Sequence, residues 1–139
     1  MKVQDINIVA GILAKVNFGK DISDQKIRLT LYNDFYHIRR IVKQASEDRQ
    51  EIIDKFQADW RDSLAAVQAF RQENKPVVGH DDFLEAEKNA NEAISALFSA
   101  EVDATLKPVK IDAFMAAYKG NELTFEDIAA LQESGVLEE

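Results

Sequence analysis

The sequence predicts a mainly α-helical protein: a long-helix antiparallel hairpin of the helical-bundle or coiled-coil type, with a small peripheral β element and two short C-terminal helices. Residues 21–74 contain neither proline nor glycine, and their apolar residues recur at three- and four-residue steps. A second helical stretch, residues 82–100, follows after a short loop. The whole chain of 139 residues has five glycines and two prolines, which is few for a turn-rich β fold. We expect one helical domain.

The first predicted helix covers residues 3–16. Its apolar residues form two adjacent stripes and therefore a wide buried face; they are Val3, Ile6, Val9, Leu13, Ile8, Ile12 and Val16. Met1 to Val3 could instead form a short strand. Gly19 is a plausible left-handed cap in the break that follows.

The long helix is predicted over residues 21–74, with Asp21, Ser23 and Asp24 as competent N-caps. About 50 helical residues would span about 75 Å, which is long for a domain of this size. The polar stretch at residues 46–51 interrupts the apolar stripe. We therefore expect exposure or a bend there, separate partners that cover the two ends, or a second copy of the chain packed against the helix.

The helix predicted over residues 82–100 is rich in alanine. Small side chains allow two helices to approach closely. The short loop at residues 75–81 favours antiparallel neighbours. This helix should therefore pack against the C-terminal half of the long helix, around residues 56–70.

A period-two pattern at residues 102–107 predicts a short strand that ends before Pro108. Its candidate partners are residues 2–4 and 76–78. Two short helices are predicted over residues 112–119 and 124–134. Their expected caps and stops are Asp112, Gly120, Thr124 and Gly135.

Composition restricts the possible functions. The absence of cysteine excludes disulfides, cysteine-ligated metals and thiol catalysis. No signal peptide and no apolar run of membrane-spanning length is apparent, so we expect a soluble, cytoplasmic protein. The net charge of −8 argues against non-specific nucleic-acid binding. Residues 1–43 nevertheless contain eight Lys/Arg and four Asp/Glu, against nine and twenty-one in the rest, which leaves room for a local anion site.

The candidate binding site is a cluster of cationic and aromatic residues in the N-terminal half of the long helix. Helical spacing places most of them on one face, with His37 alongside; they are Arg28, Tyr32, Tyr36, His37, Arg39, Arg40 and Lys43. Arginine recognises phosphate or carboxylate, and tyrosine offers a stacking surface and a hydroxyl. The alternative is an amphipathic face whose tyrosines are half-buried and whose arginines pair with the acidic C-terminal half.

No pattern in the sequence indicates catalysis. His37 has no serine or aspartate partner at motif spacing, although histidine titrates near neutral pH. His80 precedes two aspartates, Asp81 and Asp82, but a metal site needs three or four ligands, so we expect a loop role and no metal or other cofactor. Nucleophile elbows, phosphate loops and dinucleotide fingerprints are absent. We expect a protein that is not an enzyme.

The order of the elements resembles a group of short phage- and prophage-encoded proteins of unknown function. The resemblance covers the layout of most of the chain: Met1-Lys2-Val3 and Ile12-Leu13, the long charged helix, Ser99-Ala100-Glu101-Val102-Asp103 running into a strand, and Leu123 to Leu131 as a terminal helix. It implies a phage context, in the host cytoplasm or in the virion, and it supplies no catalytic residues.

Two classes of function fit these observations. One is a non-enzymatic interaction or structural module that self-associates or binds a virion or host protein through its helices. The other is a protein that binds or sequesters a small anionic ligand such as a nucleotide, for example to counteract host defence, through the Arg/Tyr residues.

Overall fold

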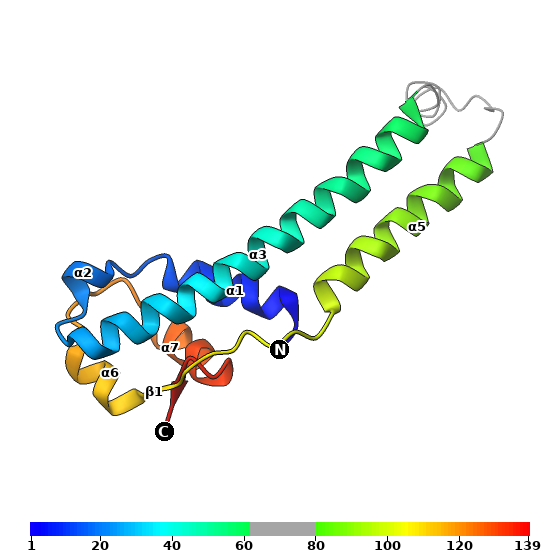
Figure 1. Ribbon diagram of the computed structural model, residues 1–139. Helices are drawn as coiled ribbons and strands as arrows, with labels where there is room; N and C mark the ends of the chain where they lie inside the picture. Colours follow the sequence, from blue (N-terminus) through cyan, green and yellow to red (C-terminus); the bar gives the residue numbers. More distant parts are fainter. Residues whose placement is uncertain (62–79) are drawn as a thin grey trace. The chain divides into compact units, whose positions relative to one another are not determined.

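The computed structural model describes residues 1–61 and 80–139, and it confirms a mainly α fold with one small sheet (Figure 1). The chain divides into two units. The first comprises Met1–Gln44 and Ser99–Glu139, and the second comprises Ala45–Phe98. Helix α3 (Gln25–Asp59) contributes residues to both.

The first unit contains the main hydrophobic core. It is built from α1 (Val3–Leu13), α2 (Phe18–Asp21), the N-terminal part of α3, α6 (Ile111–Ala117) and α7 (Phe125–Glu133). The core residues with no more than 1% exposure are Ile6, Leu13, Ile22, Leu31, Ile38, Phe114, Leu131, Val136 and Leu137. The apolar face predicted for the first helix is confirmed, because Val3, Ile6, Val9, Ile12 and Leu13 are all buried.

The N-terminus is fixed to the segment that follows α5 (His80–Ser99). The amide of Val3 donates to the carbonyl of Ala100 (3.1 Å), and the N-terminal amine pairs with the Glu101 carboxylate at 2.8 Å. Lys2 forms a single antiparallel bridge with Glu101, so extended pairing is confined to one residue and the helix begins at Val3.

The start of the long helix differs in detail from the prediction. Residues 18–21 form the separate short helix α2, capped by Asn17, whose side chain accepts from the Lys20 amide at 3.2 Å. Gly19 lies inside this turn and is not a left-handed cap. Helix α3 then begins at Gln25, where the Asp24 carboxylate accepts from the Ile27 amide at 3.0 Å, as expected of an N-cap.

Helix α3 continues without interruption through the polar stretch at residues 46–51. Five of these six residues are exposed and Asp48 is half-buried, so the predicted exposure is confirmed. The rest of the predicted long helix, residues 62–74, and the predicted loop at residues 75–79 lie outside the described residues.

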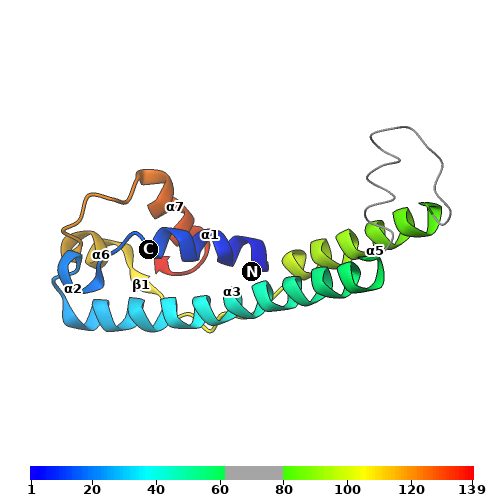
Figure 2. The ribbon, with the colours of Figure 1, turned by 90° about the horizontal axis from the view of Figure 1, so that it is seen from above.

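In the second unit, α3 and α5 run side by side in opposite directions (Figures 1 and 2). Phe83, near the start of α5, is fully buried, and its ring lies 5.5 Å from Phe56 and 5.7 Å from Trp60, both near the end of α3. These contacts confirm the predicted hairpin partner.

The predicted strand at residues 102–107 is wrong. Thr105 adopts a left-handed conformation (φ 54°), and its amide donates to the Asp103 side chain at 2.8 Å, which is local turn geometry. The amide of Lys107 donates to the buried carboxylate of Asp34 instead of to a neighbouring strand. The sheet forms after Pro108, where β1 (Val109–Lys110) pairs in parallel with β2 (Leu137–Glu138).

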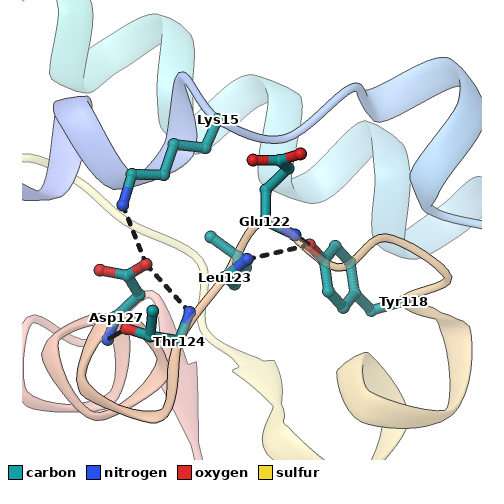
Figure 3. Close-up of polar contacts among 6 residues, drawn as sticks. All are labelled: Lys15, Tyr118, Glu122, Leu123, Thr124 and Asp127. Carbon is teal, nitrogen blue, oxygen red and sulfur yellow. Dashed lines mark hydrogen bonds and ion pairs between the residues drawn. The ribbon is translucent and has the colours of Figure 1, made fainter.

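Polar contacts order the connection between α6 and α7 (Figure 3). The Tyr118 hydroxyl accepts from the amides of Glu122 and Leu123, at 3.2 and 3.3 Å. Thr124 and Asp127 form a reciprocal capping box, and Lys15, in the turn after α1, pairs with the Asp127 carboxylate at 3.1 Å. The predicted N-cap of the last helix is therefore confirmed.

The end of α7 is also as predicted. Gly135 has φ 86°, its amide donates to Gln132, and the Val136 amide donates to Leu131 at 3.0 Å. This pair of hydrogen bonds is a Schellman motif. Among the residues described, no helix is long and apolar enough to span a membrane.

Candidate functional site

One side of the N-terminal part of α3 faces the core and the other faces solvent. Leu31 and Ile38 are at most 1% exposed. At about 100° per residue, the six residues Arg28, Tyr32, Tyr36, Arg39, Arg40 and Lys43 fall within about 120° of arc on the opposite side. Arg28 is half-buried and the other five are exposed. We call these six residues the Arg/Tyr face.

Large apolar surface is exposed on this face. Tyr32 is 58% exposed and Tyr36 is 53% exposed. Leu29 lies on the same side and is 60% exposed; the sequence-based site did not include it, although its spacing of three and seven residues from the tyrosines places it there. Exposed large apolar side chains that lie next to one another are a feature of interaction sites.

Two cations of the face lie over aromatic rings one turn earlier in α3. The guanidinium carbon of Arg39 is 5.5 Å from the centre of the Phe35 ring, and that of Arg40 is 5.9 Å from the centre of the Tyr36 ring. Such cation–π contacts hold the charged groups close to the helix surface. The cations and the rings therefore form one continuous surface.

Helix α2 supports one edge of the face, beside the start of α3 (Figures 1 and 2). The Phe18 ring packs edge-on against Tyr32 (5.9 Å) and stacks on Phe35 (5.7 Å). Arg28 has a structural contact as well, since its Nε donates to the Ile22 carbonyl at 3.2 Å. Arg28 is thus the least available cation of the set.

The structure places His37 at the margin of the face. It is half-buried and about 100° around the helix from Tyr36, although the two rings touch at 5.9 Å. Burial raises the pKa of the Asp34 carboxyl, and His37 opposes part of that rise electrostatically. His37 is therefore not brought together with Arg28 and Arg39.

The pairing of these arginines with acidic residues is not seen where the structure describes both partners. The ion pairs among residues 1–61 and 80–139 involve Lys15, Lys88, Lys110 and the N-terminal amine, and none involves Arg39, Arg40 or Lys43. The three cations are therefore available to bind another molecule.

Asp34 is the polar residue that sequence reasoning missed. It is 1% exposed, on the core side of α3. One oxygen, Oδ1, accepts from the Lys107 amide at 2.9 Å, while Oδ2 accepts no hydrogen bond from the described part of the chain. Burial raises the pKa of this carboxyl, against the lowering effect of the Lys107 amide and of the His37 and Lys107 charges. The signal was present in the sequence, because Asp34 stands between Leu31 and Ile38 in the apolar stripe.

The described residues contain no group of three or more His, Cys, Asp or Glu side chains arranged to hold a metal ion. Comparisons with protein families, with curated proteins and with solved structures found no match to this chain. The Arg/Tyr face is therefore the candidate functional site of the described residues.

Proposed function

We propose that this chain is a non-enzymatic protein-interaction module of the phage type, which binds a protein partner through the Arg/Tyr face of α3. The observation that carries the proposal is the exposure of Leu29, Tyr32 and Tyr36, at 60%, 58% and 53%, beside cations with no intramolecular ion pair among the described residues. Tyrosine and arginine are among the residues most enriched at the centres of protein interfaces. The phage context comes from the layout of the helices.

The shape of the face favours a protein over a small ligand. All six side chains project from one helix, which makes a ridge. Sites for small molecules are concave and enclose most of the ligand, whereas a helical ridge fits into the groove of another helix. Binding of a nucleotide at this face is the alternative that the experiment must separate.

The test compares the tagged wild-type chain with the double variant Arg39→Ala/Arg40→Ala. Both are purified from the native host cell, and the molar mass of each purified complex is measured by light scattering. We expect the wild type to retain a protein partner, either a second copy or another protein, in a simple ratio. The double variant should retain about tenfold less of that partner, because it lacks two cations that the contact would remove from water. Lys2→Ala/Lys119→Ala is the matched control, since it removes the same charge from exposed positions outside the face.

Two outcomes would contradict the proposal. The first is a double variant that retains every partner of the wild type. The second is a thermal shift with nucleotides that the wild type shows and the double variant lacks, in the absence of any protein partner. A ligand at 100 times its dissociation constant adds about 2.7 kcal/mol of stability, which such a screen detects.

A further inference from the structure

The exposed residues of α3 have an ordered arrangement about Tyr36. Along the outermost line of the helix lie Leu29, Tyr32, Tyr36, Arg40 and Lys43, which we call the α3 stripe, and all five are exposed. Apolar and aromatic side chains precede Tyr36 by seven and four residues. Cationic side chains follow it by four and seven residues. The two halves of the stripe therefore match in spacing and differ in chemistry.

We propose that the partner of the α3 stripe is a second copy of this chain, bound antiparallel about a two-fold axis that passes beside Tyr36. This inference rests on the proposed function and names the partner of the same face. In antiparallel pairing about Tyr36, a residue that precedes Tyr36 by a given number of positions lies beside the residue of the second copy that follows Tyr36 by the same number. Tyr32 then meets Arg40 of the second copy, and Leu29 meets the aliphatic stem of Lys43.

The charges select this arrangement over a parallel one. In a parallel pair, Arg40 and Lys43 of one copy would lie beside the same cations of the other, and like charges in contact repel. In the antiparallel pair, each cation lies against an aromatic or apolar group. Because a two-fold interface repeats every contact, the Arg40–Tyr32 contact forms twice, and the assembly closes as a dimer.

The side chains are already placed for these contacts. Arg40 lies over its own Tyr36 ring at 5.9 Å, so its guanidinium stays within the stripe and does not extend into solvent. A guanidinium accommodates one ring on each of its faces. Phe18 packs edge-on against Tyr32 at 5.9 Å, which limits the motion of that ring. Residues fixed in this way lose less conformational entropy when they bind.

A charge exchange tests the register. Arg40→Glu places two carboxylates against the Tyr32 rings, and Tyr32→Lys places two ammonium groups against Arg40. We expect each variant alone to dimerise about tenfold or more weakly than the wild type, because both copies of the contact are lost. An equimolar mixture should regain dimers, since it contains one native Tyr32–Arg40 contact and one ion pair between the introduced groups.

Sedimentation equilibrium measures the dissociation constants of the wild type, of each of the two variants and of the mixed dimer. Lys26→Glu is the control, because it makes the same charge change on an exposed α3 residue outside the stripe, and it should dimerise as the wild type does. A mixture that associates no more tightly than either variant alone would overturn the antiparallel register. So would an Arg40→Glu variant with wild-type affinity.

Cysteine cross-linking tests the axis in a chain that has no cysteine of its own. Tyr36→Cys places two thiols beside the axis, so mild oxidation should give a covalent dimer. Leu29→Cys is equally exposed on the same stripe, but two-fold pairing separates its two copies by 14 residues, or about 21 Å, which no disulfide can bridge. Cross-linking of both variants to the same extent would indicate parallel or random contact and would overturn the proposal.

The outcomes separate this inference from the proposed function. A wild-type chain that remains monomeric at high concentration, with no cross-link at position 36, defeats the second copy as partner. The proposed function survives that result if Arg39→Ala/Arg40→Ala still loses another protein, and it fails if no partner depends on the face.

Discussion

The buried carboxylate of Asp34 holds the segment that follows α5 in place against α3. Its Oδ1 atom accepts from the Lys107 amide at 2.9 Å, and its Oδ2 atom accepts no hydrogen bond from the described residues. Because burial raises its pKa above the ordinary value of 3.8, the folded protein holds the proton more tightly than the unfolded chain does. The stabilising effect of protonation is complete below pH 3.8 and is lost as the pH rises through the folded pKa.

We predict that Asp34→Asn keeps the acceptor for the Lys107 amide and removes this pH dependence. Its free energy of unfolding should improve relative to the wild type as the pH rises above 3.8, since the amide needs no charge to be buried. Urea unfolding between pH 3.5 and pH 7 measures the difference. Asp34→Ala is the contrast, because it leaves the Lys107 amide without its acceptor; it should be about 1–3 kcal/mol less stable than Asp34→Asn at every pH, since neither side chain titrates. A constant difference between Asn variant and wild type across this range would show that Asp34 does not titrate as described.

Gly120 and Gly11 differ in the space available for a side chain, so the same substitution to alanine should have opposite effects on stability at the two positions. A Cβ at position 120 would lie 2.7 Å from the Tyr118 hydroxyl and 2.9 Å from the Asp21 carboxyl, whereas a Cβ at position 11 would meet nothing within 4 Å. The Tyr118 hydroxyl accepts two backbone amides, so its displacement breaks the turn before α7. Gly120→Ala should therefore destabilise the protein by about 1–3 kcal/mol. Gly11→Ala, inside α1, should stabilise it by about 0.5–1 kcal/mol.

Thermal unfolding followed by circular dichroism distinguishes the two glycine variants. The expected result is a lower Tm for Gly120→Ala and a higher one for Gly11→Ala. Equal effects of the two substitutions would refute the steric argument, because both add the same methyl group to the chain.

At the scale of elements, α7 shows how strongly local signals determine a helix. Thr124 and Asp127 supply the capping box, and Gly135 supplies the left-handed residue of the Schellman motif. We predict that Thr124→Ala lowers stability by about 1 kcal/mol and that Thr124→Ser is nearly neutral, because serine retains the hydroxyl acceptor for the Asp127 amide. Guanidinium unfolding measures both variants, and an alanine variant as stable as the serine variant would argue that the box does not contribute.

The capping box also shifts the pKa of Asp127, in the direction opposite to the shift of Asp34. The Thr124 amide, and after it Lys15, holds the pKa of Asp127 below its ordinary value of 3.8. Its contribution is present above pH 3.8 and is lost as the pH falls through the lower, folded pKa. As the pH falls, protonation therefore relieves the burial of Asp34 above pH 3.8 and weakens the start of α7 below it.

Elements with complete local signals were predictable from the sequence, and those set by distant residues were not. The caps of α3 and α7 and the pairing of α5 with α3 follow from residue type and spacing. The strand expected at residues 102–107 did not form, because Asp34, 73 positions away, accepts the Lys107 amide. The local pattern of residues 102–107 carries no information about so distant a partner. The parallel pairing of residues 109–110 with 137–138 is equally non-local.

The candidate site divides in the same way. Helical spacing alone predicts that Tyr32, Tyr36 and Arg40 share a face, because this depends only on the period of the helix. That this face is the exposed one depends on the position of the core. The contact of Arg28 with the Ile22 carbonyl and the support of Tyr32 by Phe18 required the turn of α2, which the sequence pattern did not predict.

At the scale of the whole molecule, the main hydrophobic core lies within one unit. Every residue of the core cluster belongs to residues 1–44 or 99–139, and the chain leaves this unit at Gln44 and returns to it at Ser99. The Arg/Tyr face belongs to the same unit. A unit with its own core is expected to fold without the rest of the chain.

We therefore predict that replacing residues 45–98 with about ten Gly/Ser residues leaves a folded protein. Such a linker spans about 17 Å on average, and loop closure costs little more for each added residue, so the connection itself adds no large penalty. The shortened chain should unfold in one cooperative transition, by circular dichroism and by calorimetry, and the proposed dimerisation through Arg40 should be retained. A shortened chain that lacks a cooperative transition would show that residues 45–98 are required to complete the core, in spite of the division into two units.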